Sequence, residues 1–163
     1  MDRKEIAARS AVAQIQNGMA VGLGSGSTSL VAVRVLAERV RTEGLHVVGV
    51  ATSAATEREA RALGIPMATL DEQPVLDIAI DGADQVDTQL ACIKGYGGAL
   101  LREKIVALST RRFLVMVDAS KLSLVLDKPV PVEFLPFALG VVRRGLAALG
   151  GRLRPLRVGA LEL

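Results

Sequence analysis

A lysine stands beside three glycines in the stretch IKGYGGALLREKI, residues 93–105, directly ahead of a charged run that is typical of a helix. Glycines let a backbone take conformations that place it close to a ligand. Lys94 and the acid Glu103 therefore indicate a catalytic site, in which a fixed positive charge and a carboxylate act on the same substrate. The plain alternative is a loop followed by a solvated helix start.

The spacing within that helix predicts where Glu103 points. Leu101, Ile105 and Leu108 recur at i, i+4 and i+7, which predicts that they form the face packed on the core. Two residues turn a helix by about 200°, so Glu103 lies roughly opposite Leu101 and away from the core. A surface glutamate in an early turn, where the helix dipole favours an acid, explains this position equally well.

A second stretch, GLGSGSTS at residues 22–29, suits a phosphate. Its glycines allow close backbone approach, the helix that follows offers free N–H groups, and Ser25, Ser27 and Thr28 add hydroxyl donors beside Gly26. It is not a dinucleotide fingerprint, because a serine holds the third glycine position, and it is not a Walker A loop. A structural turn with Ser or Thr as the helix N-cap is the alternative.

Two acids and a second lysine also fall at strand ends. Asp81 and Asp84 in DGAD could bind hydroxyls, shuttle protons or hold a divalent cation, or could simply form a turn. Lys121 closes the sequence DASK after another apolar strand. Ligands of open α/β sheets bind at the carboxyl ends of the strands. These residues, with Lys94 and the phosphate loop, indicate a small, phosphorylated, hydroxyl-rich substrate.

The elements that must position these residues alternate along the chain, which predicts a Rossmann-like α/β fold with a parallel sheet and helices on both faces. Several strands are apolar on both faces, as a covered parallel sheet requires. Ser53 and Gly64 are expected to cap and stop one helix. The expected helices are residues 2–16, 27–41, 55–64, 98–109 and 137–150, and the expected strands are 18–24, 45–53, 65–70, 74–81, 112–120 and 151–158.

Composition excludes several classes of protein. The net charge of +3 is mild, and three Phe, one Tyr and no Trp give no stacking platform, so we expect no nucleic-acid partner. One Cys and one His make a zinc site improbable and a disulfide within the chain impossible. The first ten residues lack an apolar signal region, and charges interrupt every long apolar run, so we expect a cytoplasmic protein without a membrane span.

Six motifs in order resemble the ribose-5-phosphate isomerase A family: GLGSGSTS, TSAATEREA, AIDGADQVD, IKGYGGALLREKI, VDASK and PVPVEFLP. The resemblance runs from near the N-terminus to residues 149–152. It implies interconversion of ribose 5-phosphate and ribulose 5-phosphate in the pentose phosphate pathway, without a metal or organic cofactor. It also implies a homodimer or homotetramer, provided that the part of the family absent here is not required.

The same resemblance implies roles for individual residues. Glu103 would be the general base that moves a proton between C2 and C1 through an enediolate. Lys94 would contact the sugar oxygens that gain charge, while Asp81 and Asp84 would bind hydroxyls and assist ring opening. The implied substrate-binding residues are Ser25, Gly26, Ser27, Thr28, Asp81, Gly82, Ala83, Asp84, Lys94, Gly95, Tyr96, Gly97 and Lys121.

Three features depart from the family pattern. Ser25 replaces a threonine and keeps the hydroxyl, and Tyr96 replaces a glycine, where its ring could narrow the site. The chain is also short, so we expect a catalytic domain over residues 1–128 and the incomplete start of a small α+β domain over 129–163. Two other functions stay open: a non-catalytic or inactivated sugar-phosphate-binding protein, and a nucleotide-dependent oxidoreductase, which the missing third glycine disfavours.

Overall fold

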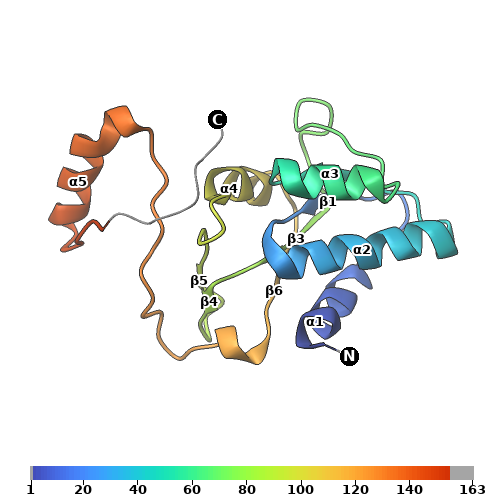
Figure 1. Ribbon diagram of the computed structural model, residues 1–163, viewed down its shortest axis with the longest axis horizontal. Helices are drawn as coiled ribbons and strands as arrows, with labels where there is room; N and C mark the ends of the chain where they lie inside the picture. The colour runs from blue at the N-terminus through green and yellow to red at the C-terminus, as the bar shows by residue number, and fades with distance from the viewer. Residues whose placement is uncertain (1, 155–163) are drawn as a thin grey trace.

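The computed structural model describes residues 2–154, which form a parallel sheet flanked by helices and a C-terminal helix that stands apart (Figure 1). The sheet has the order β2-β1-β3-β6, and all three pairings are parallel. Its strands are β1 (Ala20–Leu23), β2 (Val48–Ala51), β3 (Ile78–Gly82) and β6 (Phe113–Met116). The helices are α1 (Arg3–Val12), α2 (Gly26–Glu43), α3 (Ala54–Ala62), α4 (Leu100–Leu108) and α5 (Leu139–Ala148).

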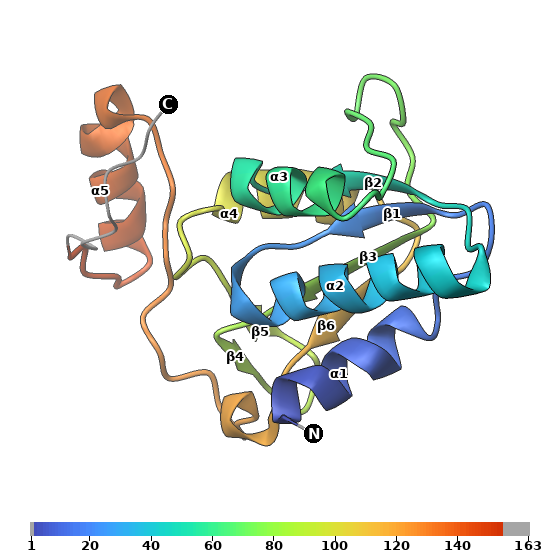
Figure 2. The same cartoon turned by 45° about the vertical axis from the view of Figure 1, so that its right-hand side comes forward.

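Alternating side chains divide the core between the two faces of the sheet, which confirms the predicted fold class. Val21, Leu23 and Ile80 belong to the larger cluster, which includes the buried residues of α1 and α2. Their neighbours in sequence point to the other face, where Ala79 belongs to a smaller cluster with Val106 of α4. Figure 2 shows α1 and α2 together beside the sheet.

The predicted core face of α4 is wrong. Leu101, Ile105 and Leu108 are 57%, 44% and 75% exposed, and the buried residues of the helix are Glu103 and Val106. A β-carbon on Gly22 would lie 2.7 Å from Val106 Cγ1, so the glycine of β1 allows α4 to lie close to the sheet on its Val106 side. A stripe spaced i, i+3 therefore faces the sheet, and Leu101, Ile105 and Leu108 face outward.

Other expectations are met in part. Ser53 Oγ accepts a hydrogen bond from Thr56 N at 3.1 Å, and Gly64 follows α3 with φ +82°, which confirms the predicted cap and stop. The strand expected at 65–70 is a single bridge between Gly49 and Met67, because Pro66 has no N–H to extend the ladder. Residues 151–154 form no strand, and the remainder of the strand expected at 151–158 lies outside the described residues.

Two features carry the chain beyond the main sheet. The hairpin of β4 (Gln85–Val86) and β5 (Cys92–Ile93), which the sequence pattern did not predict, connects β3 to the glycine loop ahead of α4. The proline segment, residues 127–136, runs from the sheet body toward α5 without forming a strand (Figure 2). Of the helices in the described part of the chain, none is long and apolar enough to cross a membrane.

Candidate active site

The loop that follows β1 is held by one buried carboxylate. Asp81, at the end of β3, is 2% exposed, and its Oδ1 accepts hydrogen bonds from Ser25 N at 3.1 Å and from Ser29 Oγ at 3.0 Å. A β-carbon at Gly24 would lie 2.0 Å from the same oxygen, so only glycine fits there. Asp81 thereby fixes the predicted phosphate loop against the carboxyl end of the sheet.

Lys94 lies between two carboxylates. Its Nζ is 2.9 Å from Asp81 Oδ2 and 3.1 Å from Glu103 Oε2, and it also donates to the carbonyl oxygen of Gly82. Burial alone would lower the pKa of the Lys94 ammonium, but the negative charges of Asp81 and Glu103 outweigh burial and raise it. The lysine therefore stays positively charged between the two carboxylates.

Glu103 is 6% exposed and faces this lysine rather than open solvent, which rules out the alternative of a surface glutamate. Its Oε1 accepts a hydrogen bond from Ser25 Oγ at 3.1 Å, and Ser25 Oγ lies 2.7 Å from Thr52 Oγ1. Its Oε2 pairs with Lys94 by charge but has no partner in hydrogen-bond geometry among residues 2–154. One carboxylate oxygen is thus available to a proton.

Burial is the main reason that the pKa of Glu103 is raised. The negative charge of Asp81 adds to the increase, while Lys94 and the hydroxyl of Ser25 oppose it. A carboxylate with a raised pKa is a stronger base than one in water. The site therefore combines a basic carboxylate with a cation 3.1 Å away, which suits proton abstraction next to a carbonyl.

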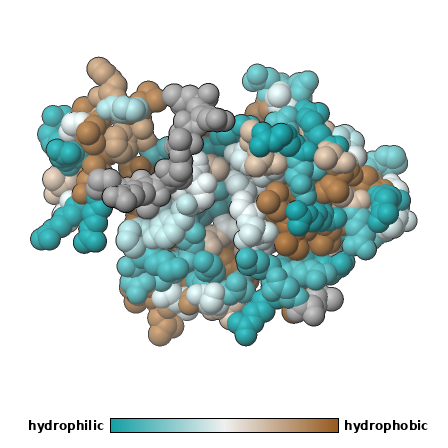
Figure 3. Space-filling view, in the orientation of Figure 1, coloured by the Kyte–Doolittle hydropathy of each residue, from teal (hydrophilic) through white to brown (hydrophobic). Residues whose placement is uncertain are grey.

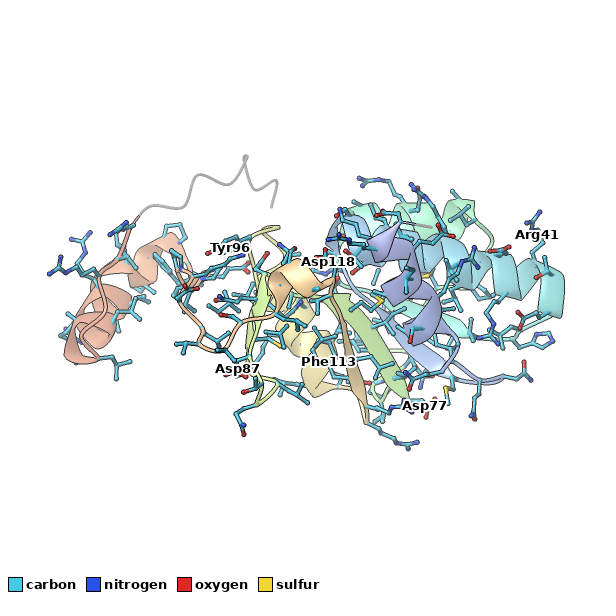
Figure 4. The ribbon with its side chains drawn as sticks, turned by 90° about the horizontal axis from the view of Figure 1, so that it is seen from below. Arg41, Asp77, Asp87, Tyr96, Phe113 and Asp118 are labelled. Carbon is cyan, nitrogen blue, oxygen red and sulfur yellow. The ribbon has the colours of Figure 1, made fainter. Side chains whose placement is uncertain are left out.

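Asp84 and Tyr96 have structural contacts near the cleft. Asp84 Oδ2 accepts a hydrogen bond from Tyr96 N at 3.1 Å, which ties the DGAD turn to the glycine loop. The Tyr96 hydroxyl donates to the carbonyl oxygen of Pro129 at 2.9 Å, and the residue is 38% exposed. Figure 4 shows Tyr96 on the side of the proline segment. Its ring does not line the cleft, unlike the other predicted residues.

These groups surround a cleft of about 320 Å³ at the carboxyl ends of the strands. Figure 3 shows pale and hydrophilic residues around the hollowed centre of this face. Figure 4 places Asp118 just beyond β6, whereas Asp77 lies at the opposite end of the sheet. The lining residues are Lys4, Ser25, Gly26, Ser27, Thr28, Asp81, Gly82, Ala83, Asp84, Lys94, Gly95, Gly97, Glu103, Met116, Val117, Asp118 and Lys121.

Lys4 lines the cleft although the sequence pattern gave no reason to expect it there. It lies on α1, and its Nζ donates a hydrogen bond to Ser27 Oγ at 2.9 Å. No motif surrounds it, and only the packing of α1 beside α2 brings it to the phosphate loop. Lys4, Lys94 and Lys121 all line the cleft.

Donors from the protein already occupy the carboxylate of Asp81, one of the two paired aspartates. Asp81 already accepts from N–H, hydroxyl and ammonium donors, so a cation would have to displace Lys94. Within residues 2–154, no three His, Cys, Asp or Glu side chains are placed to hold a metal ion. Another hollow of about 350 Å³, between α1 and α2, is lined by surface ion pairs such as Arg9–Glu38 and lies away from the strand ends.

Comparison with protein families shows which family this chain belongs to. The family model described as ribose 5-phosphate isomerase A (phosphoriboisomerase A) matches residues 48–161. This chain belongs to the ribose 5-phosphate isomerase A family. The match includes the DGAD turn, Lys94, Glu103 and Lys121, so the cleft is built largely from the region that defines the family.

Relatives of known name agree with this assignment. The ribose-5-phosphate isomerase A of Gloeobacter violaceus is 53% identical over 153 residues, and that of Methanosarcina acetivorans is 50% identical over 149 residues. These matches include 92% and 91% of this chain. The chain spans 66% and 64% of the length of these two curated relatives, slightly less than two thirds.

Solved structures of the family share the fold. The ribose 5-phosphate isomerase A of Methanocaldococcus jannaschii superposes with a TM-score of 0.86 at 44% identity, over 91% of this chain and 67% of that one. The enzyme of Neisseria gonorrhoeae superposes with a TM-score of 0.87 at 38% identity, over 97% and 70%. The parallel sheet and its helices are therefore those of the ribose 5-phosphate isomerase A family.

Proposed function

We propose that this chain interconverts ribose 5-phosphate and ribulose 5-phosphate, with Glu103 as the general base. One observation carries the proposal: the buried Glu103 carboxylate keeps an oxygen without a hydrogen bond among the described residues, 3.1 Å from the Lys94 ammonium. A base and a cation held so close can remove a proton next to a carbonyl and stabilise the oxyanion that forms.

The isomerisation needs only one carboxylate to move the proton. Glu103 takes the proton from C2 of the open-chain aldose, and the electron pair of that bond forms the enediolate, whose O1 gains the negative charge beside Lys94. The protonated Glu103 then returns the proton to C1, while the hydroxyl proton on O2 transfers to O1 and leaves a carbonyl at C2. Substrate and product have the same atoms, so no oxidant or co-reactant is consumed.

The loop at the start of α2 supplies the contacts for a phosphate in the same cleft. The N-terminus of α2 presents free N–H groups, and Ser27 and Thr28 add hydroxyls. Lys4 and Lys121 bring two positive charges to the same lining. A solved ribose-5-phosphate isomerase in complex with phospho-erythronic acid superposes with a TM-score of 0.86 at 38% identity, which supports a phosphorylated sugar chain as the ligand.

The second candidate is a sugar-phosphate-binding protein without turnover. The relatives named above are ribose-5-phosphate isomerases, which favours turnover over this candidate. The division of the chain at residue 128, the homodimer or homotetramer and the cytoplasmic location stay predictions. A nucleotide-dependent oxidoreductase has no support from the family to which the chain belongs.

Ketose formation from ribose 5-phosphate tests the proposal, with the parent chain compared with Glu103→Gln. We expect the parent to turn over and the variant to lose about 10²- to 10⁴-fold in kcat, because glutamine cannot accept the proton. Titration calorimetry on both proteins separates the candidates. Tight binding without turnover by the parent supports the second candidate, and equal rates for parent and variant remove Glu103 from its role.

A further inference from the structure

Helix α4 carries the proposed base but has little packing to hold it. Only Glu103 and Val106 of its nine residues are buried, and its exposed residues are the apolar Leu101, Ile105 and Leu108 and the charged Arg102 and Lys104. Its N-cap position is occupied by Ala99, whose side chain has no acceptor for the free N–H groups of the first turn. The direction of Glu103 must therefore be fixed by contacts from outside the helix.

The proline segment supplies such a contact. Glu133 Oε2 accepts a hydrogen bond from Leu101 N at 2.7 Å, so a carboxylate 32 residues later in the chain caps the first turn of α4. A carboxylate at a helix N-terminus is stabilised by the helix dipole as well as by the bond itself. Leu101 is two residues before Glu103, and the cap therefore acts on the turn that carries the base.

The register of the proline segment is fixed by bonds to the loops of the cleft. The buried Gln85 side chain donates a hydrogen bond from Nε2 to Asp127 Oδ1 at 2.6 Å. Its Oε1 accepts a hydrogen bond from the N–H of Lys128 at 3.2 Å. Lys128 Nζ donates to the carbonyl oxygen of Asp84 at 2.9 Å. Farther along, Pro129 accepts from Tyr96, as described above.

Close packing completes this attachment. Gly95 has φ +108°, and a β-carbon there would lie 3.0 Å from Pro131 Cβ and from Leu100 Cδ2. The glycine loop, the proline segment and the start of α4 therefore pack together where only a glycine fits. This places Glu133, two residues after Pro131, at the end of α4.

We propose that Glu133 is a positioning residue for Glu103: its carboxylate caps α4 and holds the first turn where Glu103 faces Lys94. The proposal rests on the proposed isomerase function for its kinetic readout. Glu133 does not line the cleft, so we place it outside the groups that contact the substrate. Its effect is on kcat, since a displacement of about 1 Å at the reacting group can cost about 100-fold in rate.

The kinetic experiment compares Glu133→Ala, Glu133→Gln and Glu72→Ala with the parent. Glu72 is a matched control, because its Oε2 accepts from Thr69 N at 2.8 Å in a turn away from the cleft. We expect Glu133→Ala to lose about 10- to 100-fold in kcat with KM changed less than about 3-fold. Glu133→Gln keeps an acceptor oxygen and restores most of kcat, and Glu72→Ala matches the parent.

Amide hydrogen exchange tests the cap without relying on turnover. We expect the Leu101 amide to lose at least about 10-fold in protection in Glu133→Ala, to regain it in Glu133→Gln and to be unchanged in Glu72→Ala. If the alanine variant does not fold, Glu133→Asp, whose carboxylate is one methylene shorter, takes its place. A parent-like kcat in a Glu133 variant whose Leu101 amide has lost protection overturns the proposal, as does unchanged protection.

An inactive parent would contradict the proposed function, and the positioning role would then be decided by NMR. The Glu103 carboxyl resonance is titrated in the parent and in Glu133→Ala. A shift of its titration midpoint toward that of a solvated glutamate supports the role, because the side chain has left its buried position beside Lys94. An unchanged midpoint together with unchanged exchange at Leu101 overturns it.

Discussion

Helices α2 and α4 flank the same sheet on opposite faces but are held there by different forces. In α2 the residues buried against the sheet and α1 are small or apolar: Ser29, Ala32, Val33, Val35, Leu36 and Ala37. In α4 the buried residues are Glu103 and Val106, while Leu101, Ile105 and Leu108 are exposed. The apolar pattern therefore sets the orientation of α2 but not that of α4.

The difference separates a helix that stabilises the fold from one that serves the site. Burying Leu36 removes apolar surface from water and contributes about 1.5–3 kcal/mol. Burying an ionised Glu103 has a free-energy penalty of several kcal/mol, which its contacts with Lys94 and Ser25 only partly offset. The raised pKa of Glu103 expresses the same imbalance, because burial outweighs its favourable partners. Polar contacts at the cleft thus hold α4 at a cost to stability.

Lys94→Met is expected to have the largest effect on stability. It removes the ammonium that lies between Asp81 and Glu103 and leaves two buried carboxylates facing each other. Breaking a buried ion pair from one side costs about 3–5 kcal/mol, so we expect the free energy of unfolding at pH 7 to fall by about that amount. Urea unfolding followed by circular dichroism measures it. The deficit should shrink at lower pH, where one carboxylate takes up a proton.

Lys104→Met on the same helix is the control for this change. Lys104 is exposed, so its removal should alter the free energy of unfolding by less than about 0.5 kcal/mol. Equal losses for Lys94→Met and Lys104→Met would show that the charge network does not hold α4, and the contrast with α2 would fail.

Glu103→Gln is expected to remove activity and add stability above the pKa of Glu103. The folded-state pKa of Glu103 lies above its value in the unfolded chain, mainly because of burial. Between these two pKa values the folded protein binds more protons, so the Glu103 contribution to stability falls as pH rises through that window. Glutamine does not titrate, so the free energy of unfolding that Glu103→Gln gains over the parent should be larger at pH 8 than at pH 4.

Thermal unfolding of both proteins across that pH range measures the gain in stability. The titration of Glu103 should also control the activity of the parent. In the parent, kcat/KM should fall about tenfold for each pH unit below the pKa of Glu103, because only the carboxylate accepts a proton. A gain in Tm for the variant that is larger at pH 4 than at pH 8 would mean that the buried carboxylate is stabilising. That result would contradict the claim that ionised Glu103 lowers the stability of the fold.

The sequence predicted the strand-end loops because glycines, hydroxyls and acids at those points have few other uses in an α/β sheet. It placed Glu103 in the cleft only with help from the family pattern, since spacing alone assigned the core face of α4 to the three exposed residues. Periodicity reports where apolar residues lie, not which stripe meets the sheet. Gly22 determines which stripe of α4 meets the sheet, because a glycine there leaves room for Val106. Gly22 lies on a strand 84 positions before Val106, so the local spacing within α4 cannot show this.

Contacts between distant segments also escaped the sequence. Lys4 reaches Ser27 only because α1 packs beside α2, and Glu133 reaches Leu101 only because Gln85 fixes the proline segment. Lys4 lies outside every motif, and the PVPVEFLP motif that contains Glu133 gives no sign of its partner Leu101. Local spacing has no signal for such pairs, whereas the tertiary fold makes them specific.

The smallest effect is expected for Leu108→Ala, and it sharpens the contrast between the two helices. Leu108 is 75% exposed on α4, so its truncation should change the free energy of unfolding by less than about 0.5 kcal/mol. The matched change Leu36→Ala on α2 empties a fully buried position and should cost about 2–5 kcal/mol. Urea unfolding of the two variants measures the difference. A cost above about 1.5 kcal/mol for Leu108→Ala would mean that another surface covers the outward face of α4 in solution, and sedimentation velocity on the parent would then show whether that surface belongs to a second copy.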